Sequence, residues 1–126
     1  MFEKVSRIEC RSENYDTDLI LDVNVDIYPL DIGDKFAFAL ASTLNLDQTV
    51  DDGFYTQSTH ETIADKYKYE YVMHGKVFKC EPVKSRLAIY ASFGGLLMKL
   101  EGDPRNLHEI QLDQRIYLLV RKVVSV

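Results

Sequence analysis

Cysteine, proline and glycine are scarce in this chain of 126 residues, and no long apolar run occurs. The two cysteines, Cys10 and Cys80, are too few for a disulfide framework and too widely spaced for a zinc site. Two reduced core thiols would indicate an intracellular protein, and a single disulfide between them stays open. Three prolines and six glycines exclude collagen-like and low-complexity classes.

The longest stretch without a charged residue covers residues 87–98, which is only twelve residues. A helix that spans a bilayer needs about 20 apolar residues. The first residues, Met1 to Lys4, lack the apolar segment of a signal peptide. We therefore expect no membrane partner and no secretory leader.

Acidic residues outnumber basic ones, with 20 Asp and Glu against 15 Lys and Arg and a net charge of −5. Binding to a phosphate backbone normally requires a basic face, so the charge argues against nucleic-acid binding by the chain as a whole. The balance suits a soluble protein or one with a basic protein partner, and a local basic patch stays open. A content of 46% hydrophobic and 28% charged residues is typical of a globular protein, and the length predicts a single domain over residues 1–126.

Apolar and polar residues alternate with a period of two along most of the chain, which predicts strands. The strongest case places five apolar residues on one face: Leu19, Leu21, Val23, Val25 and Ile27. Pro29 and a turn at 31–34 would end this strand, and residues 36–40 would return as the second strand of a hairpin. Further strands are expected at 7–11, 67–80, 87–93, 96–100 and 116–124. About seven strands with few or no helices predict an all-β antiparallel barrel or sandwich.

Glycine marks the breaks between these strands. Gly94-Gly95 between two alternating runs predicts a hairpin with a primed turn, and Gly75 predicts a bulge or a sharp bend. Residues 102–104 read as another turn. The polar segment 44–65, and residues 51–65 above all, predicts one long surface loop.

Residues that could carry chemistry are few. The histidines His60, His74 and His108 have no second ligand at metal-binding spacing, so we expect no metal site. No glycine-rich phosphate loop or nucleophile elbow occurs, and we expect no cofactor and no catalytic residue. An enzyme with a carboxylate pair in the mouth of the barrel stays open, but no pair stands out.

Three alternating tyrosines, Tyr67, Tyr69 and Tyr71, are flanked by Lys66 and Lys68. Aromatic rings on one face of a small barrel can stack the bases of single-stranded nucleic acid. The rings can equally form a barrel wall with their hydroxyl groups in water. We favour the wall, because a stacking site also needs a positive groove and this chain is acidic.

Nine short motifs follow one another in an order that resembles a known family. They are Arg7 within 5–7, then 18–24, 27–31, 33–36, 41–44, 51–53, 69–77, Phe93-Gly94-Gly95-Leu96-Leu97-Met98 and 106–108. Together they resemble the eighth subunit of eukaryotic DNA-directed RNA polymerases, which polymerases I, II and III share. The resemblance extends from Phe2 to Val123.

The resemblance implies a barrel related to the oligonucleotide-binding fold, with the long loop at about 51–65. It also implies a nuclear, non-catalytic structural component that docks mainly on the largest polymerase subunit, beside other polymerase subunits, without reading nucleic-acid sequence. Family members usually carry an extra strand before the segment that matches Phe2 to Arg7. We therefore expect one barrel strand to be missing or replaced, unless the start codon is misassigned; the barrel then stays open or a partner supplies the edge.

Candidate partner-binding residues follow from the glycine hairpin and from the missing strand. They are Phe93, Gly94, Gly95, Leu96 and Leu97, together with a strand edge that runs from Tyr71 to Lys76. Two residues without side chains beside large apolar ones would let another chain approach closely. The alternative function is a free protein that binds single-stranded nucleic acid through the tyrosines.

Overall fold

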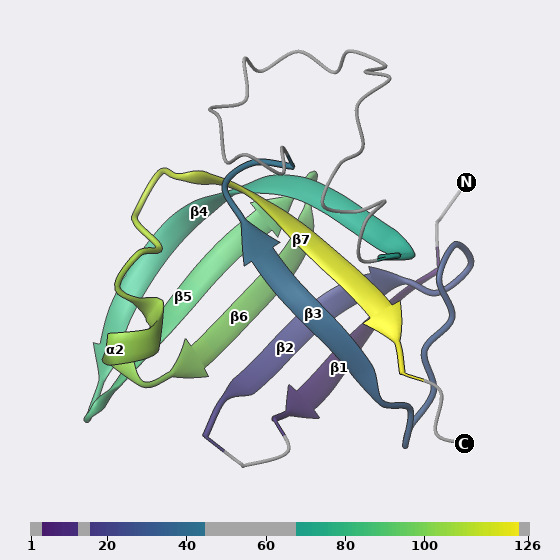
Figure 1. Cartoon of the computed structure of the whole chain (residues 1–126), viewed down its shortest axis with the longest axis horizontal. Helices are drawn as coiled ribbons and strands as arrows, with labels where there is room; N and C mark the ends of the chain where they lie inside the picture. Colours follow the sequence, from purple (N-terminus) through teal and green to yellow (C-terminus); the bar gives the residue numbers. More distant parts are fainter. Residues whose placement is uncertain (1–3, 13–15, 45–67, 124–126) are drawn as a thin grey trace. The chain divides into compact units, whose positions relative to one another are not determined.

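The computed structural model describes residues 4–12, 16–44 and 68–123 (Figure 1). Within them it contains β1 (Val5–Arg11), β2 (Asp18–Asn24), β3 (Phe36–Ala41), β4 (Tyr71–Val83), β5 (Arg86–Phe93), β6 (Leu96–Gly102), α2 (Pro104–Leu107) and β7 (Arg115–Lys122). About seven strands and almost no helix were predicted, and this is confirmed. The loop predicted at 51–65, with His60, lies outside the described residues, as does Tyr67. No helix in the described part of the chain is long and apolar enough to span a membrane.

The chain divides into two compact units. Unit 1 consists of Met1–Leu30 and Gly75–Gln114, and unit 2 consists of Asp31–His74 and Arg115–Val126. The strand β4 begins in unit 2 and continues into unit 1, so one strand order, β1-β2-β6-β5-β4-β7-β3, runs through both. The predicted all-β antiparallel fold is confirmed, and this order is consistent with a barrel-like fold.

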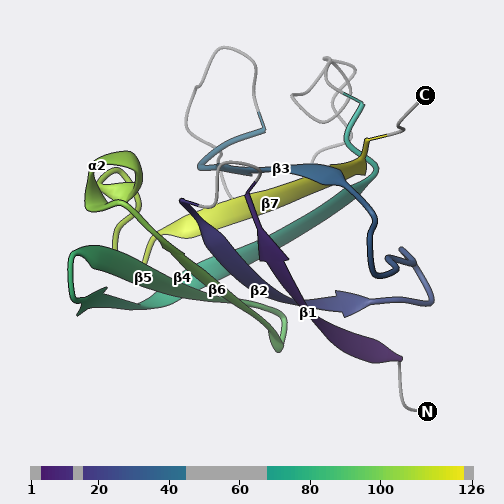
Figure 2. The ribbon, with the colours of Figure 1, turned by 90° about the horizontal axis from the view of Figure 1, so that it is seen from below.

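The core of unit 1 follows from the period-two alternation. Leu21 on β2 lies opposite Met98 on β6, and Met98 lies opposite Ala91 on β5. All three side chains are buried, because residues in register on neighbouring strands point to the same face of a sheet. Burying a side chain such as Leu or Met stabilises the fold by about 1.5–3 kcal/mol. In Figure 2, β1 lies alongside β2 in the same unit.

The strand β2 ends at Asn24, earlier than the alternation predicts. The side-chain oxygen of Asn24 accepts hydrogen bonds from the backbone amides of Asp26 (3.1 Å) and Ile27 (3.3 Å), which turns the chain. Ile27 is consequently 70% exposed. The prediction that Ile27 continues the buried face of β2 is wrong, because a local side-chain to backbone interaction ends the strand first.

The predicted hairpin between β2 and residues 36–40 is also wrong. The strand β2 pairs with β1 and β6, whereas β3 pairs with β7 over its whole length. The turn at 31–34 forms as expected, since the Asp34 amide donates to the carbonyl oxygen of Asp31 at 3.0 Å. This turn therefore lies between two strands that do not pair with each other. The sequence could not show this, because alternation indicates which face of a strand is buried and not which strand lies beside it.

Unit 2 joins β3, β7 and the start of β4. The Glu70 amide donates to the carbonyl oxygen of Val120 (2.9 Å), and the Lys122 amide donates to the carboxylate of Glu70 (2.9 Å). Leu118 and Val120 of β7 are buried beside their β3 partners, Leu40 and Phe38. The alternation predicted for β7 holds for Ile116, Leu118 and Val120, but Leu119 on the other face is buried as well.

The predicted turn at 102–104 contains the end of β6 at Gly102 and the start of the helix α2 at Pro104. The Asp103 side chain accepts a hydrogen bond from the Arg105 amide at 2.9 Å, and Pro104 follows it in the first turn. Aspartate at the N-cap followed by proline is a common start of a helix. Leu107 of this short helix is buried in unit 1.

Candidate partner-binding surface

The hairpin between β5 and β6 has the predicted primed turn. Phe93 pairs with Leu96, and the two residues between them, Gly94 and Gly95, have φ angles of 63° and 98°. Positive φ at both central positions defines this turn and explains why glycine occupies them. Apart from its neighbours in the chain, a Cβ atom at either glycine would meet no atom of the described residues within 4 Å, so the tip of the hairpin is open among them.

The side chains that flank this turn differ in exposure. Phe93 is buried in the core of unit 1, Leu96 is half-buried, and Leu97 is 41% exposed. Leu97 is thus the most exposed large apolar side chain that flanks this turn. Phe93 holds the hairpin on the core beneath it.

A buried carboxylate fixes the position of Leu97. Asp22 on β2 accepts a hydrogen bond from the Leu97 backbone amide at 3.0 Å. The same carboxylate accepts hydrogen bonds from Nε (2.8 Å) and Nη2 (3.2 Å) of Arg7 on β1. The hydrogen bonds from Arg7, together with that from the Leu97 amide, lower the pKa of Asp22 below its ordinary value, against the opposing effect of burial. The hairpin is therefore tied to β1 and β2 through one ionised side chain.

The second predicted contact segment, Tyr71 to Lys76, lies at the start of β4. Tyr71 is buried, whereas Lys76 is exposed and forms an ion pair with Asp113 at 3.7 Å. Register with β5 begins at Lys76, so the residues before it extend past the paired part of that ladder. Since β4 lies between β5 and β7 in the strand order, it is not a terminal strand, and the partner-binding edge stays a prediction.

The sequence matches a family described as RNA polymerase Rpb8 over residues 1–122. The chain belongs to the RNA polymerase Rpb8 family. Among its relatives, "DNA-directed RNA polymerases II, IV and V subunit 8B" of Arabidopsis thaliana is 50% identical over 125 residues, which cover 97% of this chain and 84% of that protein. The predicted family resemblance is thereby confirmed.

Two further relatives of this Rpb8 family chain carry names that refer to three polymerases. "DNA-directed RNA polymerases I, II, and III subunit rpabc3" of Dictyostelium discoideum is 49% identical over 123 residues, covering 96% of this chain and 84% of the relative. "DNA-directed RNA polymerases I, II, and III subunit RPABC3" of Saccharomyces cerevisiae is 41% identical over 130 residues, covering 96% and 87%. Both matches extend over nearly the whole chain.

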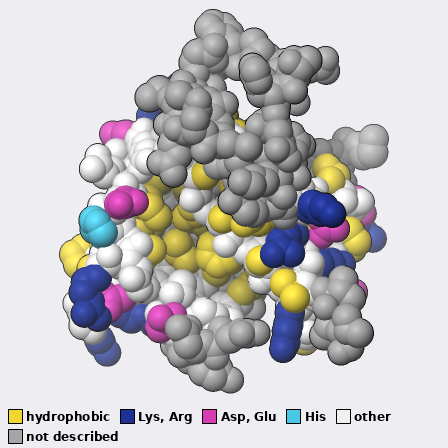
Figure 3. Space-filling view, viewed as in Figure 1, with side chains coloured by type: hydrophobic (Ala, Val, Ile, Leu, Met, Phe, Trp, Pro, Cys, Tyr) yellow, Lys and Arg dark blue, Asp and Glu magenta, His cyan; other side chains and the backbone are white. Residues whose placement is uncertain are grey.

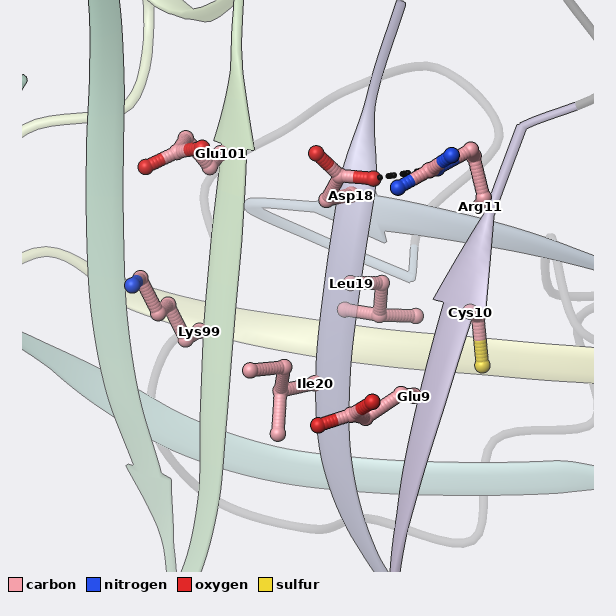
Figure 4. Close-up of a pocket in the computed structure, with 8 residues that line it drawn as sticks. All are labelled: Glu9, Cys10, Arg11, Asp18, Leu19, Ile20, Lys99 and Glu101. Atoms are coloured by element: carbon pink, nitrogen blue, oxygen red, sulfur yellow. Dashed lines mark hydrogen bonds and ion pairs between the residues drawn. The ribbon is translucent and has the colours of Figure 1, made fainter. Parts of the chain in front are cut away.

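A groove of about 580 Å³ lies on unit 1 of this Rpb8 family chain, bordered by β1, β2 and β6 (Figure 4). It is lined by Glu9, Cys10, Arg11, Asp18, Leu19, Ile20, Lys99 and Glu101. Asp18 accepts hydrogen bonds from Arg86 (2.9 Å) and Arg11 (3.0 Å), and Arg86 also pairs with Glu101 at 3.2 Å. The hydrogen bond from Arg86, followed by that from Arg11, lowers the pKa of Asp18. These paired charges hold the strands together.

The groove also contains a thiol, which comes from Cys10 on β1. Burial raises the pKa of Cys10 to about 11. A thiol with this pKa is protonated near neutral pH, and the protonated form is a poor nucleophile. Cys10 therefore acts as a half-buried packing residue beside Leu19, its partner on β2.

Of the three tyrosines considered for base stacking, which was the less favoured interpretation, Tyr67 lies outside the described residues. Tyr71 is buried, and Tyr69 precedes β4 and follows Lys68, whose φ angle of 57° interrupts the extended backbone. On the face drawn in Figure 3, Lys and Arg side chains lie beside Asp and Glu side chains. Neither the buried ring nor this mixed charge favours the alternative of a free protein that binds single-stranded nucleic acid.

The described histidines make ordinary contacts. The ring of His74 lies 4.5 Å from the ring of Tyr117, centroid to centroid. Nδ1 of His108 lies 2.7 Å from the carbonyl oxygen of Arg105. Among the described residues, no three His, Cys, Asp or Glu side chains are grouped to hold a metal ion.

Sequence reasoning missed a set of side chains on β4, β5 and β6. Phe78 and Lys79 lie next to a register shift in β4, which falls between Val77 and Lys79 and not at the predicted Gly75. Tyr90 and Lys99, in register on β5 and β6, complete the set. A bulge or a sharp bend was predicted at Gly75 because glycine often marks one, but the bulge lies elsewhere, and at Gly75 the absent Cβ leaves room for the neighbouring strand β5.

Proposed function

We propose that this chain is a non-catalytic subunit common to nuclear RNA polymerases I, II and III and that it docks on the largest subunit. The observation that carries the proposal is its 41–49% identity, over nearly its whole length, to proteins named as subunits of polymerases I, II and III. A structural role agrees with a chain whose described charges pair with one another across strands. Catalysis would then reside in other subunits of the complex.

The proposed contacts with the largest subunit are the β5–β6 hairpin of unit 1 and, as a separate segment, Tyr71 to Lys76 at the start of β4. Leu97 supplies the exposed apolar side chain, Gly94 and Gly95 supply an open backbone, and Leu96 is half-covered. Phe93 is buried in unit 1, so it supports the hairpin from below, and Tyr71 is buried at the start of β4. A partner that covers Leu97 would gain about 25 cal/mol for each Å² of apolar surface removed from water.

The experiment is co-purification of the tagged full chain from nuclear extract. We expect the largest subunit of each of the three polymerases to accompany the wild-type chain. Leu97→Glu should lower this yield about tenfold or more, because docking would bury a carboxylate without a partner. Leu112→Glu is the matched control, since Leu112 is also an exposed leucine of unit 1 that lies outside the hairpin.

The outcomes separate the two parts of the proposal. If Leu97→Glu assembles as well as Leu112→Glu, docking through the hairpin is wrong and the role as a subunit stands. If the wild-type chain accompanies none of the three polymerases, the role as a subunit is wrong. Gly94→Trp is a less direct probe, because a side chain at the positive φ of Gly94 also strains the turn.

A further inference from the structure

The bulge in β4 turns two consecutive side chains toward the same face of unit 1. Val77 lies opposite Ala91 and Lys79 lies opposite Tyr90, so Phe78 is the extra residue. In a regular strand Val77 and Lys79 would share a face. Here Val77 is buried, whereas Phe78 and Lys79 are both exposed. Bulges often redirect side chains at functional positions, so this one requires an explanation.

The redirected residues surround one aromatic ring. Tyr90 has the ring of Phe78 at 6.2 Å, centroid to centroid, and the Lys79 ammonium at 5.3 Å from its centroid. The ammonium of Lys99, in register on β6, lies 5.7 Å from the same centroid. We call Phe78, Lys79, Tyr90 and Lys99 the aromatic–lysine face. It thus combines two adjacent rings with two cations.

The charges on this face are available to a partner. No ion pair joins Lys99 to another described residue, and its ammonium lies over the ring of Tyr90 at the border of the groove. Lys79 pairs with Glu81 at 3.4 Å, but both side chains are about half exposed, and such surface pairs contribute only about 0–1 kcal/mol. Phe78 is 49% exposed and lies beside the ring of Tyr90, so part of its apolar surface is open to a partner. Because the Lys79–Glu81 pair is weak and exposed, a carboxylate of a partner could replace Glu81 as the ion-pair partner of Lys79.

We propose that the aromatic–lysine face binds an acidic protein segment that carries aromatic or aliphatic side chains. Its carboxylates would pair with Lys79 and Lys99, and its apolar side chains would pack on Phe78 and Tyr90. The charge of the face is opposite in sign to the net charge of −5 of the chain, so it provides a local site for acidic partners. The inference goes beyond the proposed function, because it assigns a second surface and states the chemistry of its partner.

The test uses the full chain and three fluorescent probes in low salt. They are a peptide that alternates Glu and Phe, a peptide that alternates Lys and Phe, and an oligodeoxythymidine. We expect anisotropy to report tightest binding of the acidic peptide, and added salt to weaken it. The double variant Lys79→Gln/Lys99→Gln should weaken this binding about tenfold. Its matched control is Lys4→Gln/Lys84→Gln, which removes the same charge from two exposed positions of unit 1.

A second variant, Phe78→Ser, separates apolar contact from charge. It should weaken binding of the acidic peptide and leave the salt dependence unchanged. The proposal is overturned if the acidic peptide does not bind or if both lysine double variants bind it equally. It is also overturned if the basic peptide binds as tightly, or if the oligonucleotide binds and the acidic peptide does not. The assay needs no polymerase, so its outcome is independent of the co-purification experiment.

Discussion

The backbone amide of Leu97 donates a hydrogen bond of 3.0 Å to the carboxylate of Asp22, 75 positions earlier in the chain. Arg7 binds the same carboxylate from β1, so one side chain on β2 joins the strands on both sides of it. Asp22 is buried, and a buried carboxylate is retained only when its hydrogen-bonding groups are satisfied. This contact places the exposed Leu97 side chain on an ordered hairpin.

Asp22→Asn should lower the free energy of unfolding by about 1–3 kcal/mol. The amide keeps the shape of the side chain, but its NH₂ group accepts no hydrogen bond, so one of the two oxygens that bind Arg7 and Leu97 is lost as an acceptor. Urea denaturation followed by circular dichroism would measure the loss. Asp26→Asn is the control, because Asp26 is exposed and lies just beyond the end of the same strand. Equal stability of the two variants would contradict the role given to Asp22.

The contribution of Asp22 to stability should depend on pH. Its folded-state pKa is lowered below the ordinary 3.8, first by the hydrogen bonds from Arg7. A lowered pKa stabilises the fold fully above the unfolded-state pKa, and this stabilisation is lost as the pH falls through the folded-state pKa. The stability difference between wild type and Asp22→Asn should be constant from neutral pH to about 5 and shrink below 4. A difference that grew on acidification would have the wrong sign.

Gly75→Ala should be far more harmful than Gly94→Ala. A Cβ atom at Gly75 would collide with the carbonyl oxygen of Ser92 and lie 2.7 Å from the Phe93 ring, so we expect a loss of about 3 kcal/mol or more. Gly94 has open space but a φ of 63°, which limits the expected cost to about 1–2 kcal/mol. Thermal unfolding of both variants would compare them. Similar melting temperatures would show that β4 does not approach β5 as described.

Arg86→Lys should destabilise unit 1 by about 1–2 kcal/mol. The guanidinium of Arg86 binds Asp18 at 2.9 Å and the carbonyl oxygens of Asp16 and Glu101 at 3.0 Å each. A lysine ammonium cannot reach these oxygens from one position with the same geometry. Denaturant unfolding would measure the cost. Arg105→Lys is the control, because Arg105 is highly exposed and should lose almost nothing.

Sequence alternation predicted the strands well because their environment repeats every two residues. β6 shows this, since Met98 and Leu100 are buried between the less buried Leu97, Lys99 and Glu101. The β5–β6 turn was also predictable, because two consecutive positive φ angles require glycine. The pairing of β3 with β7 was not predictable, because a strand's pattern contains no information about which strand lies beside it.

The candidate site was predicted only in part. The hairpin containing Leu97 was located, but the burial of Phe93 and the exposure of Leu97 depend on which face of β5 and β6 meets the core. The aromatic–lysine face was missed because the bulge at Phe78 breaks the period of two on which the prediction depends. Asp22 appeared in sequence as one polar residue on the outer side of a strand. Its role requires two partners on other strands.

The amino-acid sequence by itself determined the all-β class, the seven strands, the glycine turn and the family, because each can be recognised from residues that are close together in the sequence. Tertiary structure decided which strands are neighbours, where β2 stops, which carboxylates are buried and where Lys79 points. These features depend on groups far apart in sequence that meet only when the sheet forms. Their energies belong to pairs of residues on different strands, so no local pattern can reveal them.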